Sequence, residues 1–97
     1  MPKYVIERHI PDAGKLTADD LRGIATRSNA VLAQMGPQIQ WIQSFVTDNA
    51  ITCVYLADNE ELLREHASRG KFPITKVQEV RAVIDPTTAN APVAARS

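Results

Sequence analysis

The sequence predicts an α+β domain of the ferredoxin-like type, in which a four-stranded antiparallel sheet carries two helices on one face. Two observations predict it. A chain of 97 residues is long enough for one domain with a core of its own. Its segments follow the order strand, helix, strand, strand, helix, strand. Two split βαβ units with right-handed crossovers build such a sandwich and place the first strand between the third and the fourth.

The first half of the chain supplies a strand and a helix. Aromatic and β-branched side chains mark a strand over residues 3–10, which Pro11 closes. The first helix begins after Thr17, whose hydroxyl is suited to an N-cap and is followed by two aspartates in the first turn. An apolar stripe at helical spacing continues to Met35, and Gly36-Pro37 ends the helix.

The second half supplies three strands and a helix. Residues 38–48 and 50–57 are rich in β-formers, and Asp48-Asn49 between them indicates a hairpin. We expect Asp58 to cap the second helix together with Glu61, and Gly70 and Pro73 to bracket its end. Residues 76–85 alternate polar and apolar side chains and form the last strand. The domain is therefore residues 1–86, and residues 87–97 form a flexible tail.

Composition excludes several classes of protein. Eleven basic and eleven acidic residues cancel, so the chain lacks the charge that a nucleic acid or an anionic membrane would attract. No apolar run approaches the ~20 residues of a membrane span. The single cysteine cannot form an internal disulfide and suits a reducing compartment, so we expect a cytoplasmic protein.

Strand alternation divides the side chains between the helix-covered face and the open face of the sheet. We expect the more apolar set of each strand to face the helices: Tyr4, Ile6, Ile10, Ile42, Val46, Val54, Leu56, Val80, Ala82 and Ile84. The open face then carries Val5, Glu7, His9, Trp41, Phe45, Cys53, Tyr55, Val77, Glu79, Arg81 and Val83, whereas Arg8 points the other way. Such an apolar face is usually covered, which predicts a homodimer of stacked sheets.

Two kinds of site fit this open face. Glu7 and His9 could jointly reach a Ni²⁺, Zn²⁺ or Co²⁺ ion, provided that a third ligand comes from another strand or subunit. The structural alternative is a cross-strand salt-bridge network of Glu7 and His9 with Glu79 and Arg81. A ligand pocket is the other possibility, with the lining residues Cys53, Tyr55, Glu79 and Arg81.

Three further residues have both a structural and a functional interpretation. His66 either packs at the core boundary or acts as a second metal ligand or proton carrier. Cys53 is better explained as a small strand residue than as a nucleophile. Pro2 leads into the first strand, and its amine could serve as a general base, as in tautomerases, only after loss of Met1. The sequence contains no phosphate-binding glycine loop, CxxC pair, HExxH motif or nucleophile elbow.

Several segments resemble a family of small bacterial proteins described as nickel-binding and nickel-responsive. They are YVIERHIPDAG, IQW, CVYLADNEE, REHASRGKFP and IDPTTA, and the resemblance spans residues 2–89. It implies a ferredoxin-like subunit, a homodimer and bound Ni²⁺, and it does not imply an enzyme. His66 matches the REHA segment, and His9 stands at a variable position of the VIER segment where an acidic residue is frequent. These are the only two histidines of the chain.

The sequence therefore leaves two functions open. The first is a non-enzymatic, cytoplasmic nickel-binding protein that sequesters or responds to the metal, with His9, His66 and Glu7 as candidate ligands. The second is a dimeric α+β barrel that binds or converts a small carbonyl or carboxylate compound. Its candidate residues on the open face are Glu7, His9, Tyr55 and Arg81.

Overall fold

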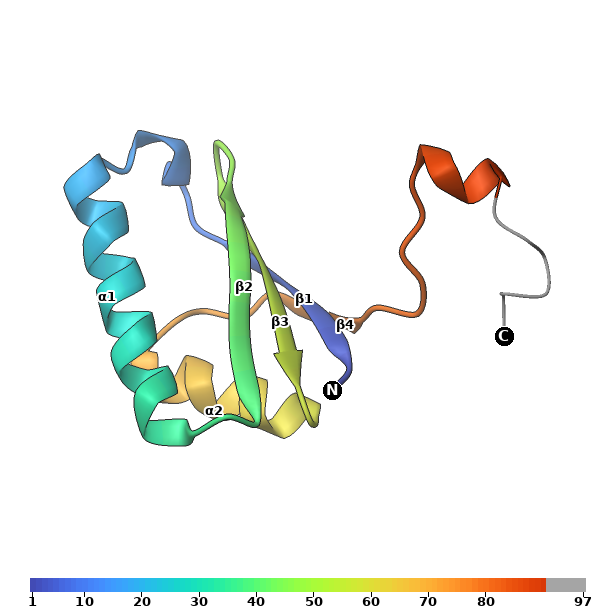
Figure 1. Ribbon diagram of the computed structural model, residues 1–97. Coiled ribbons are helices and arrows are strands. Elements are labelled where there is room, and N and C mark those ends of the chain that lie inside the picture. The colour runs from blue at the N-terminus through green and yellow to red at the C-terminus, as the bar shows by residue number, and fades with distance from the viewer. Residues whose placement is uncertain (91–97) are drawn as a thin grey trace.

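The computed structural model describes residues 1–90 and has the predicted ferredoxin-like architecture (Figure 1). Its four antiparallel strands are β1 (Lys3–His9), β2 (Ile39–Val46), β3 (Ala50–Ala57) and β4 (Lys76–Glu79), in the order β2-β3-β1-β4. Helices α1 (Ala18–Met35) and α2 (Glu60–Gly70) lie on the same side of the sheet. Two short 3-10 helices, η1 (Ala13–Lys15) and η2 (Pro86–Asn90), complete the described chain. No helix in residues 1–90 is long and apolar enough to cross a membrane.

Both helices begin at side-chain caps. The Thr17 hydroxyl accepts a hydrogen bond from the backbone N–H of Asp20, and the Asp20 carboxylate accepts one from the N–H of Thr17. This confirms the predicted cap of α1, and the same hydrogen bonds lower the pKa of the Asp20 carboxyl. The prediction for α2 was wrong by one residue. Asn59, not Asp58, caps this helix, because its side-chain oxygen accepts from the N–H of Leu62 at 3.0 Å.

A β-bulge in β2 changes which of its side chains face the helices. The pairing with β3 steps from Trp41 to Gln43, so Ile42 is the extra residue. Because one residue is inserted, the alternation reverses at this point. Trp41 consequently lies on the helix-covered side, whereas Phe45 remains on the open side with 53% of its surface exposed. The predicted placement of Trp41 on the open face was therefore wrong. Ile42, which we expected to face the helices, is exposed, so its predicted placement was wrong as well.

The predicted faces of β3 were also wrong. Cys53 and Tyr55 are buried at 5% and 2% exposure and pair directly with Ile6 and Tyr4 of β1, so they belong to the helix-covered face. Val54 and Leu56, which we expected there, lie on the open side. Both faces of this strand are apolar, so alternation alone does not distinguish them.

The last strand is shorter than predicted. β4 ends at Glu79, and the chain after it leaves the body of the molecule, as the orange segment in Figure 1 shows. Within β4, Val77 and Glu79 pair with Ile6 and Tyr4 and therefore share the helix-covered face, contrary to the prediction. The apolar residues expected to face the helices beyond this point do not reach the core: Val80, Ala82 and Ile84. Part of the predicted tail forms η2, and residues 91–97 lie outside the described residues.

Candidate functional site

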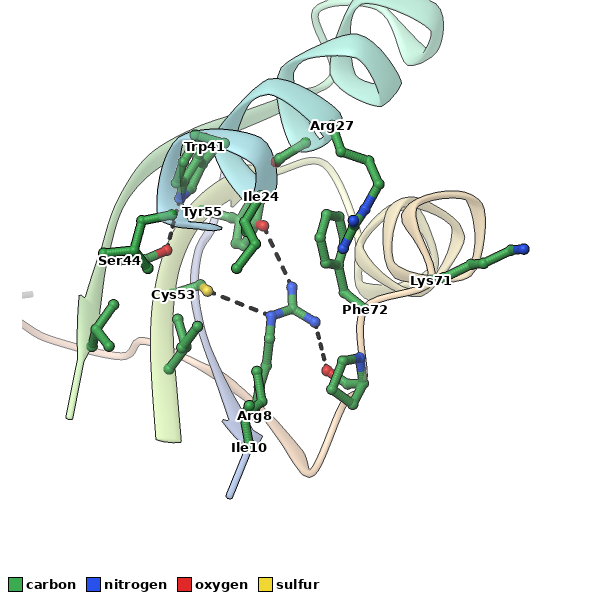
Figure 2. Close-up of a pocket in the computed structure, with 16 residues that line it drawn as sticks. Arg8, Ile10, Ile24, Arg27, Trp41, Ser44, Cys53, Tyr55, Lys71 and Phe72 are labelled. Carbon is green, nitrogen blue, oxygen red and sulfur yellow. Dashed lines mark hydrogen bonds between the residues drawn. The ribbon is translucent and has the colours of Figure 1, made fainter. Parts of the chain in front are cut away.

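A cavity of about 250 Å³ lies between the sheet and α1, beside the loop that follows α2 (Figure 2). Its walls are mostly apolar and come from β1, β2, β3, α1 and the segment after α2. The residues that line it are Arg8, Ile10, Leu21, Ile24, Ala25, Arg27, Ser28, Trp41, Ser44, Val46, Ile51, Cys53, Tyr55, Lys71, Phe72 and Pro73. Apolar pockets with a few polar groups are typical of small-molecule sites. We refer to it as the Arg8 cavity.

Arg8 lies at the inner end of this cavity and is only 3% exposed. It is on β1, two residues from the fully buried Ile6, and therefore points to the same face. Figure 2 shows its guanidinium group reaching across the space between the sheet and the loop after α2. Its Nη1 donates to the carbonyl oxygen of Pro73 at 2.7 Å, its Nη2 to the Tyr55 hydroxyl at 3.4 Å and its Nε to the Cys53 sulfur at 3.5 Å.

All of these partners of Arg8 are neutral. None of the residues that line the cavity is acidic, and none of the ion pairs found within residues 1–90 includes Arg8. Buried charges in proteins are normally paired, because removing an ion from water costs several kcal/mol. The cavity is therefore a positively charged, otherwise apolar space.

Phe72 separates the cavity from the end of α2, and its ring contacts two guanidinium groups. The guanidinium of Arg8 lies 5.5 Å from its ring centroid and that of Arg27 lies 4.7 Å from it. A Cβ atom at Gly70 would stand 2.2 Å from the Phe72 ring, so this close approach requires glycine at position 70. The aromatic wall is thus fixed by the sequence of the helix end.

His66 is fully buried beside this wall and does not face solvent. Its Nε2 lies 3.2 Å from the Ser28 hydroxyl, and its ring packs against Phe72 and Tyr55 with centroids 5.4 and 5.5 Å away. Burial lowers the pKa of His66, and the positive charge of Arg8 lowers it further. Its Nδ1 has no hydrogen-bond partner among the described residues. Of the two interpretations of His66, this arrangement fits packing in the core.

Tyr55 connects Arg8 with the Ser28 side of the cavity. Burial raises the pKa of the Tyr55 hydroxyl, while Arg8 and a hydrogen bond with Ser28 act against this shift. The hydroxyl is therefore protonated at neutral pH. Together with Arg8 it forms a pair of polar groups at the inner end of an apolar space, a combination that can orient an anionic group of a ligand.

The candidate metal ligands of the open face remain apart from this cavity. Glu7 and His9 alternate with Arg8 along β1 and are exposed on the opposite side of the sheet. Within residues 1–90, no group of three His, Cys, Asp or Glu side chains is placed to hold a metal ion. His66 is separated from both by the sheet. One chain therefore does not provide a complete nickel site from its described residues.

The predicted open-face pocket is not formed by its four candidate residues. Cys53 and Tyr55 line the Arg8 cavity on the other side of the sheet, and Glu79 belongs to that covered face as well. Arg81 lies beyond the end of β4, where it is exposed and contacts Glu79 at 3.3 Å. The predicted salt-bridge network is reduced to this pair, and neither Glu7 nor His9 takes part in the ion pairs of residues 1–90.

Sequence reasoning missed Arg8 as a site residue, although a signal for it was present. Arg8 has the same strand parity as Tyr4, Ile6 and Ile10, so alternation alone places a cation on the apolar face. A charged residue in an otherwise buried set needs a partner or a function. Phe72 and Ser28 carried no comparable signal, because an isolated aromatic residue and a helical serine are common in any core.

Comparisons with known proteins agree with this fold. The family model described as nickel responsive protein, SCO4226-like, matches residues 4–80. The crystal structure of SCO4226 from Streptomyces coelicolor A3(2) superposes with a TM-score of 0.72 at 14% sequence identity, covering 84% of this chain and 99% of that one. At this identity the likeness extends to the fold alone. Comparison with curated proteins gives no match.

Proposed function

Because the chain belongs to the SCO4226-like family of nickel-responsive proteins, we propose that it is a non-enzymatic protein that binds Ni²⁺ as a homodimer. The proposal assigns the metal to the open face of the sheet, with Glu7 and His9 as ligands. The observation that carries it is the family match over residues 4–80. The single, buried cysteine is consistent with a cytoplasmic location, which we include in the proposal.

Glu7 and His9 are the candidate ligands that are best exposed. They are two residues apart on β1, so both side chains leave the same face of the sheet. Carboxylate and imidazole are suitable ligands for Ni²⁺. Lys76 is the register partner of Glu7 on β4, yet no ion pair joins the two in the described chain. The carboxylate is therefore free to bind another group.

A second copy of the chain supplies the missing ligands in this proposal. In a twofold dimer the same patch of each subunit meets its own image. Two stacked open faces then bring two histidines and two carboxylates to the axis, which gives four protein ligands for one ion. Phe45, exposed on the same face, adds apolar area that such a dimer would bury. The expected stoichiometry is one Ni²⁺ per two chains.

Calorimetric titration of untagged protein with Ni²⁺ tests this proposal. We expect saturation at one ion per two chains, and loss of that binding in His9→Ala and in Glu7→Gln, because each change removes two of the four ligands of the dimer. Glu61→Gln is the matched control, since this carboxylate is exposed on α2 and should not contribute. Light scattering in parallel should give the mass of a dimer.

Two results would contradict the proposal. One is the absence of Ni²⁺ binding to the wild-type protein at micromolar concentration. The other is binding that persists unchanged in His9→Ala, which would remove the open face as the site. Loss of binding in His66→Ala alone would point to the buried histidine instead, provided that circular dichroism shows the variant to be folded.

A further inference from the structure

We propose that the Arg8 cavity binds a small organic carboxylate with an apolar body, and that Arg8 and Tyr55 hold its carboxylate group. This site is on the helix-covered side of the sheet and is independent of the nickel proposal, which concerns the open face. The inference is based on the charge, the shape and the lining of the cavity.

The charge of the site favours an anion. Arg8 is buried and has only neutral partners, so a ligand carboxylate would supply the counter-charge that the described chain does not. The planar guanidinium group matches a carboxylate in a bidentate arrangement, and such charge-assisted bonds are about twice as strong as neutral ones. The Tyr55 hydroxyl, 3.4 Å from Nη2, is placed to donate to the same group. These contacts select a carboxylate over a neutral molecule.

The remaining walls favour an apolar body. Away from Arg8 the cavity is bounded by aliphatic side chains of α1 and of the sheet and by the rings of Trp41 and Phe72 (Figure 2). An apolar cavity of about 150 Å³ accepts a benzene molecule. A volume of about 250 Å³ therefore has room for one ring, or a short alkyl chain, together with a carboxylate. Polyanions such as nucleotides find neither the space nor enough polar partners.

The outer rim of the cavity is cationic as well. Arg27 and Lys71 line the cavity and are exposed to solvent. Neither takes part in the ion pairs of residues 1–90. By contrast, Arg22, which lies on α1 as Arg27 does, pairs with Asp19. Unpaired cations at a cavity entrance attract anions and raise their local concentration. The charge is thus positive both at the entrance and at the inner end of the Arg8 cavity.

Fluorescence of Trp41 provides a direct test. Trp41 is the only tryptophan of the chain and lines the cavity, so a bound molecule changes its surroundings. The probes are sodium phenylacetate and sodium octanoate, each compared with a neutral analogue, phenylacetamide and octanol, in buffer with a metal chelator. We expect saturable binding of the two carboxylates and at least roughly ten-fold weaker binding of the neutral compounds, since these lack the charge-assisted bonds.

Variants distinguish the site from non-specific association. Arg8→Met should weaken carboxylate binding by roughly ten- to a hundred-fold, because it removes the cation and keeps an apolar side chain of similar length. Ala25→Leu should abolish binding, because it fills the cavity from α1 while Arg8 stays in place. Arg22→Met is the matched control: it removes an exposed cation of α1 outside the cavity and should leave binding unchanged.

Three results would overturn the inference. They are the absence of a saturable signal with either carboxylate at millimolar concentration, equal affinity for the neutral analogues, and unchanged carboxylate binding in Arg8→Met. Should Arg8→Met fail to fold, Arg8→Lys and Ala25→Leu still decide the question. The first keeps the charge without the planar fork, so it should weaken binding, and unchanged binding in both variants would exclude the cavity. Because the chelator removes metal, these outcomes leave the nickel proposal unaffected.

Discussion

Neighbouring ionisable residues of β1 have opposite environments on the two faces of the sheet. On the covered face Arg8 is 3% exposed and its hydrogen-bond partners are all neutral, whereas Glu7 and His9 beside it in the sequence are exposed on the open face. A charge in a dry environment interacts strongly with any ion that reaches it, and a charge in water does so weakly. The covered face is therefore suited to selecting one small anion. The open face needs several ligands acting together to hold a metal.

The faces also differ in how completely their apolar residues are buried. The core on the covered side includes the fully buried Ile6 and Leu63, while Phe45 on the open side is 53% exposed. Ile42 is likewise exposed, as are Met1, Val83 and Ile84 outside the strands, whereas on the covered side of the described chain only Val46, at the cavity, is exposed to a similar degree, at 40%. Stability of the single chain should therefore depend on the covered face. The apolar residues outside it should matter only when another surface covers them.

The largest expected effect tests this difference with one truncation on each face. Ile6→Ala should lower the free energy of unfolding by about 2–5 kcal/mol, since it removes a fully buried side chain and leaves a cavity. Phe45→Ala should cost less than about 1 kcal/mol in dilute protein, because more than half of the ring is already in water. Urea denaturation followed by circular dichroism measures both values.

The dependence on protein concentration sharpens the comparison. If the open face forms the dimer, the unfolding midpoint of the wild type should rise with protein concentration, and Phe45→Ala should reduce that rise. Ile6→Ala should leave this dependence of the unfolding midpoint on protein concentration unchanged. A large loss of stability in Phe45→Ala at every concentration would contradict the assignment of this face as uncovered in the single chain.

A smaller effect is expected when one charge of β1 is removed on each face of the sheet. Arg8→Met should change the free energy of unfolding by less than about 1 kcal/mol, because the lost hydrogen bonds are offset by the removal of an unpaired buried charge. Pro73, whose carbonyl accepts from Arg8, lies in an exposed loop where water can replace the guanidinium. Glu7→Gln, on the open face, should have an equally small effect. A loss of several kcal/mol in Arg8→Met would show that Arg8 serves mainly to hold this loop.

The sequence was sufficient for the order and type of the elements, because they depend on local signals. The Thr17 cap, the Gly36-Pro37 stop and the hairpin at Asp48-Asn49 act within a few residues and are where the structure has them. The four strands and two helices then allow few topologies. The predicted fold was confirmed for this reason.

The site depended on information that the sequence does not express locally. The bulge at Ile42 reverses the alternation of β2, and nothing in the pattern of that strand marks it. In β3 both faces are apolar, so Cys53 and Tyr55 were assigned to the wrong side. The apolar residues after Glu79 imitate a strand that the structure does not continue. Each error concerns the tertiary environment rather than the local conformation.

The smallest expected effect is on the pH dependence of stability, for which we compare the two histidines. The folded-state pKa of His66 is lowered from its usual value near 6.5 by burial and by Arg8, the charged group that faces it, whereas Tyr55, Ser28 and Phe72 around it are neutral. The unfolded chain therefore binds the proton more readily. The stability that the neutral form of His66 contributes is complete above about pH 6.5. It declines as the pH falls toward the folded-state pKa of His66, and below that pKa no more is lost.

Measurements of the unfolding midpoint between about pH 5 and 8 check this dependence. The carboxyl groups with lowered pKa, Asp20 and Asp85, have an ordinary value of 3.8 and act at lower pH. His66→Gln should therefore flatten the decline in this range, while His9→Gln, on the exposed face, should preserve it. If His9→Gln abolished the decline instead, the proton-sensitive group would lie on the open face.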